Sequence, residues 1–575
     1  MGFLLYGVLF IISLPIRLVP VLLISSAALT LGLTVINDRK ILLTQSPITF
    51  LDFKITALNP QGLINAVKAP PWTIYLLYAL AILAVVIVFW VLFHSSRVLS
   101  DARRKGTLGR LALNFIALIL LVVTGIFFLK QFSHTVQEFV IESDVAWESK
   151  DFSDLSKKLS IWGFLYYSYY LEKNESGDYF NSRHSATPPS KKEIEEAVKE
   201  FVNLERARPH KKPNIVVVLA ESTFNPSDAF RLTKPIKNRL FEPNKYTQAI
   251  GPMYVNAVGG GTWITEFESI IGVDSRLFGY SGYYTHASLS PYVSRSFATY
   301  LKDHGYSTET YQALEGDFYN AANAYRNYGF DRFYENIGGA GWDTTDEQFI
   351  DAVISMSHEE DKPFFKYLVT IQNHSPHRCK NFKDKTQFVT MLKGLDEFNE
   401  LNCALNEYVL NAKSTSRAFI KLIKYLEEQE KLTGRPFVLL IFGDHQPHTF
   451  SKSASVIDYY NSEQYQKFRK NFSERETFFH IVSSIPGVLK CCGGTAPHVT
   501  MMPTLLSAYV ASDLDDMYLD VNLYSLKNCG PDFLNNEVSH GGYLFNAPET
   551  PQTGKCPVYE NLLNAYRNAE IFKDF

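Results

Sequence analysis

Three apolar runs beyond residue 210 have the composition of buried strands. They span residues 213–220, 364–371 and 436–442, and they are rich in Val, Ile, Leu and Phe. Continuous apolar runs of this length are typical of strands in a parallel sheet that is covered on both faces. Such sheets place ligands at the carboxyl ends of their strands. The sequence therefore predicts an α/β fold with a central, mostly parallel sheet and a site along one of its edges.

The residues that follow these runs are acids and histidines. Glu221 follows the first run, His374 lies just beyond the second, and Asp444 and His445 lie just beyond the third. Because parallel strands end at the same edge of a sheet, we expect these side chains to lie close together. Carboxylates and imidazoles are common ligands of Zn²⁺ and Mn²⁺. Three such endings favour a metal site over the alternative that His374 merely caps a strand.

Three consecutive glycines, residues 259–261, precede Thr262. Glycine tolerates positive φ angles, so the backbone can turn sharply there and approach a ligand closely. A glycine-rich turn before a helix is by itself weak evidence of function. Beside a metal ion, however, the Thr262 hydroxyl becomes a candidate nucleophile, because coordination stabilises its alkoxide.

These segments resemble those of the alkaline phosphatase/sulfatase superfamily, in its branch of membrane-bound transferases that move phospholipid headgroups. Lipoteichoic acid synthases, phosphoglycerol transferases that act on periplasmic glucans, and lipid A phosphoethanolamine transferases belong to this branch. The resemblance covers about residues 210–510. It implies an alkaline phosphatase/sulfatase-like domain that binds one divalent metal ion, Zn or Mn. The ligands that it implies are Glu221, Thr262, Asp444 and His445.

The resemblance also implies catalytic roles. Thr262 corresponds to the nucleophile, and His374 and His498 are expected to face the substrate as catalytic and substrate-binding residues. Neutral imidazoles can donate hydrogen bonds to phosphate oxygens, and protonated ones can protonate a leaving alkoxide. Two other histidines, His377 and His448, are expected at the rim of the cleft.

The headgroup contacts depart from the family pattern. Lipoteichoic acid synthases carry a Phe-Trp-Asn-Arg stretch that contacts phosphoglycerol, and the comparable stretch here is residues 318–321. Tyr319 and Asn320 are therefore expected to bind substrate, while Ala321 replaces the arginine. Many phosphoethanolamine transferases have cysteines near the nucleophile, and none lies near Thr262. The tyrosine-rich stretch 279–286 either lines a sugar or headgroup cleft or packs as an ordinary loop.

The reaction implied is transfer of phosphoglycerol from phosphatidylglycerol, through a phosphothreonine, to a cell-envelope glycan or lipid. One alternative is a phosphoethanolamine transferase that acts on lipid A or another envelope glycan. A second alternative is a sulfatase-like phosphodiesterase or hydrolase, for which membrane spans would be superfluous. A third is a membrane-anchored binding protein, which would have lost at least one metal ligand. The net charge of −3 gives no indication of a nucleic-acid partner.

The first 130 residues have the composition of a membrane region. The stretches 18–36, 72–93 and 111–129 are apolar, and each approaches or exceeds the roughly 20 residues that cross a bilayer. The loop 95–110 is rich in Arg and Lys, which predicts a cytoplasmic location for it. The sequence therefore predicts a multi-pass protein of the bacterial cytoplasmic (inner) membrane, with its catalytic domain on the periplasmic side.

Four parts follow from this pattern: a transmembrane region, a linker with juxtamembrane helices, the catalytic domain and a C-terminal extension. Their predicted bounds are 1–130, 131–212, 213–510 and 511–575. In the linker, the aromatic cluster 161–167 either rests at the lipid interface or serves packing. Ser190 and Glu193 form a capping-box pattern that opens a helix before the first strand.

All six cysteines lie in the region predicted to be outside the cytoplasm. An even number of cysteines in an oxidising compartment suggests disulfides, although the sequence does not fix their pairing. A bond between Cys379 and Cys403 would close an insertion that follows His374.

Overall fold

The chain forms two compact units, which are described separately. One comprises Met1–Ile41 with Pro47–Tyr170, and the other comprises Leu42–Ser46 with Leu171–Phe575. The computed structural model describes residues 30–38, 40, 47–53, 161, 163–169, 189–201, 211–278, 280–357, 362–395, 397–450, 467–468, 470, 473–487, 497–510, 517–529, 566 and 570–573. The predicted spans 72–93 and 111–129, and most of 18–36, lie outside these residues. Within the described ranges, no helix combines the length and apolarity that crossing a membrane requires.

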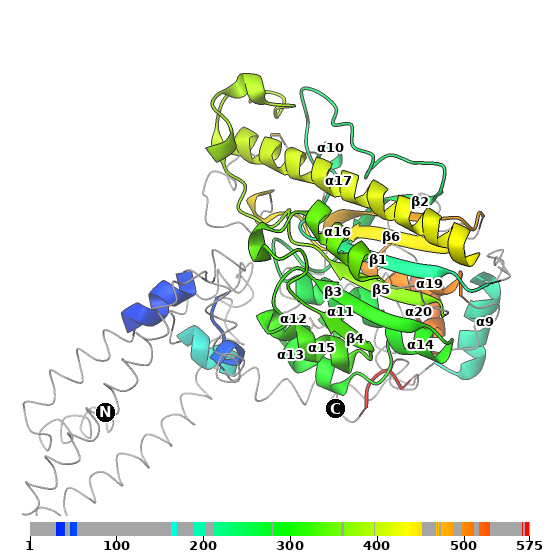
Figure 1. Cartoon of the computed structure of the whole chain (residues 1–575). Coiled ribbons are helices and arrows are strands. Elements are labelled where there is room, and N and C mark those ends of the chain that lie inside the picture. Colours follow the sequence, from blue (N-terminus) through cyan, green and yellow to red (C-terminus); the bar gives the residue numbers. More distant parts are fainter. Residues whose placement is uncertain are drawn as a thin grey trace, which may run out of the picture. The chain divides into compact units, whose positions relative to one another are not determined.

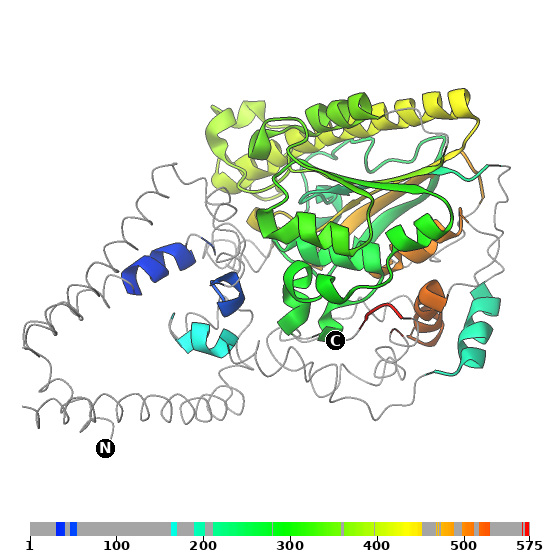
Figure 2. The same ribbon diagram turned by 60° about the horizontal axis from the view of Figure 1, so that its bottom comes forward.

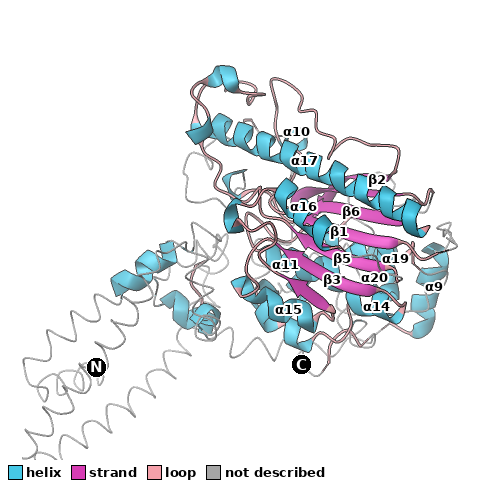
Figure 3. Ribbon diagram, viewed as in Figure 1, coloured by secondary structure: helices cyan, strands magenta, loops and turns pink. Residues whose placement is uncertain are grey.

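The second unit is built on a mixed sheet of seven strands (Figures 1 and 3). The strand order is β2-β7-β6-β1-β5-β3-β4. Four of the six neighbouring pairs are parallel, and the antiparallel pairs are β6 with β7 and β7 with β2. The strands are β1 (Asn214–Ala220), β2 (Thr247–Tyr254), β3 (Ser307–Gln312), β4 (Arg332–Tyr334), β5 (Phe364–Val369), β6 (Phe437–Gly443) and β7 (Glu476–Ser483). The three predicted strands are β1, β5 and β6, and they are neighbours at the centre of the sheet.

Helices cover both faces of the sheet, as the residues of β1 require. Ile215, Val217 and Leu219 belong to one core cluster, and the alternate residues of β1 belong to the other. Two helices cover the second face: α16 (Asp346–Met356) and α17 (Glu400–Thr433). Six helices contribute to the first: α9 (Lys191–Phe201), α11 (Thr262–Ile271), α14 (Phe297–Asp303), α15 (Ala321–Asn327), α19 (Met502–Ser507) and α20 (Met517–Cys529). Figures 1 and 2 show the sheet between these two helical layers.

Short helical turns connect the main elements. The short α-helices are α10 (Pro226–Ala229), α12 (Tyr280–Tyr283) and α13 (Thr285–Ser288). The 3₁₀ turns are η2 (Ser275–Phe278), η3 (Ser290–Tyr292), η4 (Phe318–Asn320), η5 (Gly341–Asp343), η6 (Cys379–Asn381), η7 (Lys385–Gln387), η8 (His448–Phe450) and η9 (Val499–Met501).

The predicted capping box at the start of α9 is confirmed. The backbone N–H of Ser190 donates to Glu193 Oε2 at 2.7 Å, and the backbone N–H of Glu193 donates to Ser190 Oγ at 3.3 Å. These reciprocal bonds satisfy two amides that the first turn of a helix leaves without partners. Ile194 then joins the core cluster that contains α11, so α9 is part of the second unit.

The described part of the first unit consists of short segments that pack on one another. The Phe50 amide donates to Ser168 Oγ at 2.8 Å, which joins residues that are far apart in sequence. Within the predicted aromatic cluster 161–167, Phe164 and Tyr167 are buried. Burial of these rings inside the unit favours the packing role for the cluster.

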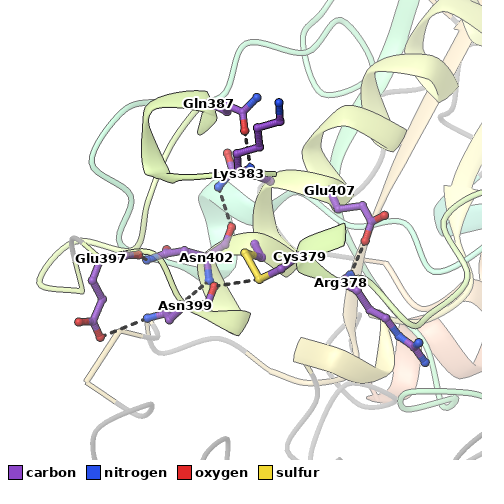
Figure 4. The surroundings of a disulfide bond; sticks show 10 residues. Arg378, Cys379, Lys383, Gln387, Glu397, Asn399, Asn402 and Glu407 are labelled. Atoms are coloured by element: carbon purple, nitrogen blue, oxygen red, sulfur yellow. Dashed lines mark hydrogen bonds between the residues drawn. A yellow bond between two sulfur atoms is a disulfide. The ribbon is translucent and has the colours of Figure 1, made fainter. Parts of the chain in front are cut away.

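Cys379 and Cys403, a pairing that the sequence left open, form a disulfide that joins η6 to the first turn of α17 (Figure 4). The first turn of α17 is capped by Asn399, whose side chain accepts a hydrogen bond from the Asn402 amide at 2.8 Å. The disulfide thus fixes the insertion after His374 to a capped helix. The side chains of Cys491, Cys492, Cys529 and Cys556 lie outside the described part of the chain.

Candidate metal centre

Two neighbouring strands deliver the acidic residues. Glu221 follows β1, and Asp444 and His445 follow β6. The register pairs Ala220 with Gly443, so the residues that follow are adjacent across the sheet. A Cβ atom on Gly443 would lie 1.7 Å from the Thr223 carbonyl oxygen. Only glycine therefore lets the end of β6 approach the turn after β1 this closely.

Thr262 enters the same space from the first turn of α11. Its cap, Gly261, has φ 87°, and Gly259 and Gly260 also have positive φ, as the predicted sharp turn requires. Thr265, one turn into the helix, donates its hydroxyl to the Asp444 carbonyl oxygen at 2.8 Å. That bond fixes the start of α11 against the loop after β6. The N-terminus of a helix also favours negative charge, so a phosphoryl group on Thr262 would be stabilised there.

The four predicted metal ligands meet at one point. Thr262 Oγ1 lies 3.2 Å from Glu221 Oε2 and 3.4 Å from His445 Nε2. His445 Nε2 lies 3.1 Å from Asp444 Oδ2. One ligand atom each from Glu221, Asp444 and His445 lies within 4.8 Å of the others. All four side chains are buried, with Thr262 the most exposed at 9%.

The chemistry of this cluster fits a divalent cation. His445 Nδ1 lies 2.9 Å from the Gln446 carbonyl oxygen, which can only accept, so Nδ1 carries the proton in the neutral ring. The lone pair of Nε2 then faces two carboxylates. Among the described residues, no hydrogen-bond donor satisfies Asp444 Oδ2. Two carboxylates, an imidazole and a hydroxyl that converge in a buried space suit Zn²⁺ or Mn²⁺.

The pKa shifts of Asp444 and His445 also favour a bound cation. Burial raises the pKa of Asp444 to about 7, and the Glu221 carboxylate adds to the rise. Burial lowers the pKa of His445, but the carboxylates of Asp444 and Glu221 outweigh this and raise it above its usual value. The carboxylates of Glu221 and Asp444 lie within 4.8 Å of each other and repel when both are ionised. A bound cation would remove that repulsion.

Ser222 positions the two carboxylates, a role that the sequence did not suggest. Its hydroxyl donates to Glu221 Oε1 at 2.7 Å, and its amide donates to Asp444 Oδ1 at 2.7 Å. Ser222 adopts φ 50°, a conformation uncommon outside glycine. The only signal in the sequence was its place directly after Glu221.

Glu266 was also missed by the sequence analysis. It lies one helical turn after Thr262, is fully buried, and accepts hydrogen bonds from Tyr319 at 2.9 Å and Tyr325 at 2.8 Å. Burial raises its pKa to about 8, and the charges of Asp444 and Glu221 contribute further. Glu266 therefore holds a proton at neutral pH. An acid four residues after the predicted nucleophile, on the same helix face, was the available signal.

The structure brings Tyr319 to the edge of this cluster. Its ring centroid lies 5.7 Å from that of Trp263, the residue after Thr262. Its hydroxyl bonds to Glu266, as described above. The side-chain amide of Asn320 donates to the His286 carbonyl oxygen at 2.8 Å. Ala321 is fully buried in the core. The substrate-binding roles of Tyr319 and Asn320 stay predictions.

His374 follows β5 and is half-buried. Its Nδ1 lies 2.7 Å from the Ser375 carbonyl oxygen, and its ring centroid lies 4.9 Å from that of Trp342. Burial lowers the pKa of His448 to about 4, and the charges of His374 and His445 lower it further. His374, His445 and His448 are therefore electrostatic neighbours. The catalytic role of His374 stays a prediction.

His377 corrects one expectation, because it does not lie at the rim of the cleft. It is 5% exposed and packs against Tyr408 and Phe450. Burial lowers its pKa to about 3, so it is neutral. The bulky aromatic side chains of α17 and η8 close over it.

The structure places His498 beside the end of β2. It forms a bridge with Tyr254 at the end of β2, and β7 separates β2 from β6. Its Nδ1 accepts a hydrogen bond from the Thr500 amide at 3.3 Å. Burial lowers its pKa far below the usual value, with Asp274 opposing this. Within the described residues no contact joins His498 to Thr262, and its predicted role is untested.

With this geometry established, comparison with known proteins identifies the domain. Residues 213–477 match the family model described as Sulfatase. This chain carries a sulfatase-family domain. The match begins at the predicted first residue of the catalytic domain and includes all four residues of the Thr262 cluster.

Three relatives match parts of the chain. An uncharacterized protein of Haemophilus influenzae is 30% identical over 41% of this chain and 44% of its own. A Rhizobium meliloti protein, whose name links it to modification of cyclic β-1,2-glucan, is 25% identical over 50% and 44%. The lipoteichoic acid synthase-like protein YvgJ of Bacillus subtilis is 23% identical over 36% and 33%. The chain thus spans less than half the length of each of these relatives.

Among solved structures, the phosphoglycerol transferase GacH of Streptococcus pyogenes, in complex with sn-glycerol-1-phosphate, is similar to this chain. The two are 17% identical, and the alignment covers 67% of this chain and 94% of GacH with a TM-score of 0.46.

Proposed function

We propose that the sulfatase-family domain is a metal-dependent transferase that moves phosphoglycerol from phosphatidylglycerol, through a phosphothreonine, to a glycan or lipid of the cell envelope. The observation that carries the proposal is the position of Thr262 Oγ1, which is 3.2 Å from Glu221 Oε2 and 3.4 Å from His445 Nε2. A hydroxyl among metal-ligand side chains is placed to lose its proton and attack phosphorus.

The transfer has two half-reactions. A divalent ion held by Glu221, Asp444 and His445 would stabilise the Thr262 alkoxide. Thr262 Oγ1 then forms a bond to the headgroup phosphorus, and the bond from phosphorus to the diacylglycerol oxygen breaks. His374 supplies the proton with which diacylglycerol leaves. In the second half-reaction an acceptor hydroxyl attacks the phosphothreonine, gives its proton to His374, and releases Thr262.

Glu266 favours phosphoglycerol over phosphoethanolamine as the headgroup. An ammonium group would need an ionised carboxylate or an aromatic cage. Glu266 accepts the hydrogen bond of the Tyr319 hydroxyl, but its raised pKa favours the protonated form, and both of its oxygens already accept hydrogen bonds from tyrosines. It is therefore unsuited to pairing with an ammonium group.

Two relatives support a polymer of the envelope as the acceptor. One is named for modification of a cyclic glucan, and the other for its likeness to lipoteichoic acid synthase. A two-step transfer through Thr262 serves either kind of acceptor, because only the hydroxyl that attacks in the second half-reaction differs.

The proposal places the enzyme in the bacterial cytoplasmic membrane, with residues 1–130 as the membrane region and residues 131–212 as the linker. The catalytic domain, residues 213–510, and the extension, residues 511–575, lie on the outer side. The bond between Cys379 and Cys403 supports this side, because disulfides persist in oxidising compartments.

The test uses labelled lipid and the intact protein. Incubation with phosphatidylglycerol and no acceptor is expected to release diacylglycerol and leave a glycerophosphate adduct on the Thr262 peptide in mass spectrometry. Thr262→Ala is expected to abolish the adduct, whereas Thr262→Ser keeps a hydroxyl and should form it. An adduct only with phosphatidylethanolamine would establish the alternative donor. Lipid cleavage that persists in Thr262→Ala would instead indicate a hydrolase without a covalent intermediate.

A further inference from the structure

A row of five aromatic rings extends from the residue after Thr262 to the predicted catalytic histidine. Consecutive ring centroids lie 5.7, 4.6, 5.2 and 4.9 Å apart. All five side chains are half-buried, so none is sealed in the core. In spatial order, this aromatic row consists of Trp263, Tyr319, Phe318, Trp342 and His374.

Three rings of the row pack on the hydrophobic core of the domain. Phe318 and Trp342 pack on the core cluster beneath α16, and Tyr319 packs on the cluster of the opposite face. Each ring therefore has one side against the protein, and part of its surface remains in water. Apolar rings of this kind beside a few polar groups are typical of ligand sites.

Trp342 is held by a tightly wound loop. Gly338, Gly339 and Gly341 have φ angles of 89°, 74° and 53°. A Cβ atom on Gly338 would lie 2.4 Å from Thr344 Cγ2, so the loop closes on itself only with glycine there. The loop thus presents a large ring beside His374 in a fixed position.

The arrangement of the rings suits an extended ligand and not a small cation. From Tyr319 onward, consecutive rings meet edge to face, at 69°, 78° and 68°, so their faces do not stack on one another. A cage for an ammonium group instead needs several ring faces turned toward one point. A row of rings offers successive contacts along a chain.

Apart from His374, which can be protonated, no cation among the described residues packs on a ring of the row. In the part of the chain that the structure describes, cation–ring contacts fall on Tyr246, Tyr311 and Phe364, which lie outside the row. A neutral ligand with both apolar faces and hydroxyl groups therefore matches the row best. Sugar rings have this chemistry, because their C–H faces pack on aromatic rings while their hydroxyls remain in water.

We propose that Phe318 and Trp342 form the acceptor subsite of the enzyme and bind a sugar ring of a neutral glycan. The row then leads the glycan toward Thr262, where its hydroxyl attacks the phosphothreonine. This inference rests on the proposed function and assigns its acceptor to the glycan class.

The first experiment measures binding without catalysis. Full-length Thr262→Ala protein is titrated with a neutral β-linked gluco-oligosaccharide, and tryptophan fluorescence and isothermal titration calorimetry are recorded. Saturable binding is expected, and adding Trp342→Ala should weaken it at least tenfold, since a buried aromatic contact carries this much affinity. Trp342→Phe keeps a ring and should retain most of the binding. Phe398→Ala is the matched control, because it removes an exposed ring that lies outside the row.

The second experiment separates the two half-reactions. In Trp342→Ala, the acceptor concentration for half-maximal transfer should rise at least tenfold. Formation of the Thr262 adduct should fall by less than threefold, because the proposal assigns Trp342 to the acceptor and not to the donor. Melting temperatures of each variant establish that the protein is folded.

Three outcomes would overturn the inference. Equal losses in both half-reactions would assign the row to the donor, and an unchanged acceptor dependence would make it packing only. Saturation by choline in place of the oligosaccharide would make it a cation site. If wild-type protein forms no adduct at all, the proposed function fails, and the binding titration still decides whether the row holds a glycan.

Discussion

Glu266 is a buried acid with a raised pKa that lies one helical turn after Thr262. A third ionised carboxylate beside Glu221 and Asp444 would add to their mutual repulsion. Burial instead raises the pKa of Glu266, and the hydrogen bonds that it accepts from Tyr325 and Tyr319 only partly offset that rise. The tyrosines are held in turn, because Tyr319 also accepts a hydrogen bond from Gln312 at 3.1 Å. Glu266 thus connects α11 to the segment that carries the aromatic row.

The raised pKa of Glu266 predicts a pH dependence of stability. The carboxyl titrates at about 8 in the folded state and near its ordinary value of 4.5 when unfolded. Between these values the folded state binds one more proton, so the free energy of unfolding falls as pH rises, by at most about 1.4 kcal/mol per pH unit. Urea denaturation from pH 5 to pH 9 is expected to show this slope in wild type. Glu266→Gln should reduce it, and equal slopes in both proteins would contradict the assignment.

Removing one carboxylate should remove the metal. Glu221→Gln keeps the shape of the side chain but loses its charge, so we expect at least a tenfold loss of Zn or Mn affinity and no Thr262 adduct. Inductively coupled plasma mass spectrometry and calorimetry measure the loss. Glu268→Gln is the control. Glu268 is also a buried acid, but it lies on α11 and outside the cluster. Full metal content in Glu221→Gln would refute the ligand assignment.

At the scale of elements, helix α11 follows the turn of residues 259–261 directly, so that turn sets where the helix enters the site. Its first residue supplies the hydroxyl, its fourth bonds to the Asp444 carbonyl oxygen, and its fifth is Glu266. Its other face enters the core through Phe267, Ile270 and Ile271. Since one rigid helix carries all of these contacts, the position of Thr262 depends on the backbone that precedes it.

Gly261→Ala is expected to displace Thr262. The substitution forces alanine to φ 87° and brings its Cβ within 3.2 Å of Ile264 Cδ1, at a cost of about 1–2 kcal/mol for the backbone. Gly305→Ala is the matched control, with φ 82° and no atom within 4 Å of its Cβ. Both variants should lose similar stability in thermal melts. Adduct formation should fall at least tenfold only in Gly261→Ala, and equal activities would show that the turn does not position Thr262.

At the scale of the whole molecule, the proposal requires the domain and the donor lipid to be on the same side of the membrane. The Cys379–Cys403 bond agrees with an oxidising compartment. The basic loop 95–110, the predicted spans 72–93 and 111–129, and most of the predicted span 18–36 lie outside the described residues.

Reporter fusions test the topology. Alkaline phosphatase, which is active only outside the cytoplasm, should be active when fused after Phe575 and inactive when fused at Arg104, because basic loops stay in the cytoplasm. Expression of both fusions, measured by immunoblot, controls for unequal amounts. The reverse pattern would put Thr262 out of reach of the outer leaflet and remove the lipid-headgroup proposal.

Local patterns in the sequence were enough to predict the central strands and the residues of the Thr262 cluster. Continuous apolar runs mark strands that are buried on both faces, and parallel strands end at one edge of a sheet. For these two reasons the amino-acid sequence alone predicts that Glu221, Asp444 and His445 lie together. The glycines before Thr262 signalled a turn for the same local reason.

Only the tertiary structure decided which distant residues surround that cluster. The contacts of Glu266 with Tyr325 and of Trp342 with His374 join segments whose spacing in sequence says nothing about their meeting. The bridge of His498 to Tyr254 at the end of β2, two strands from β6, is likewise a product of the strand order. The order of strands and the docking of helices set these distances. Both depend on packing across the whole sheet, which hydrophobic periodicity does not encode.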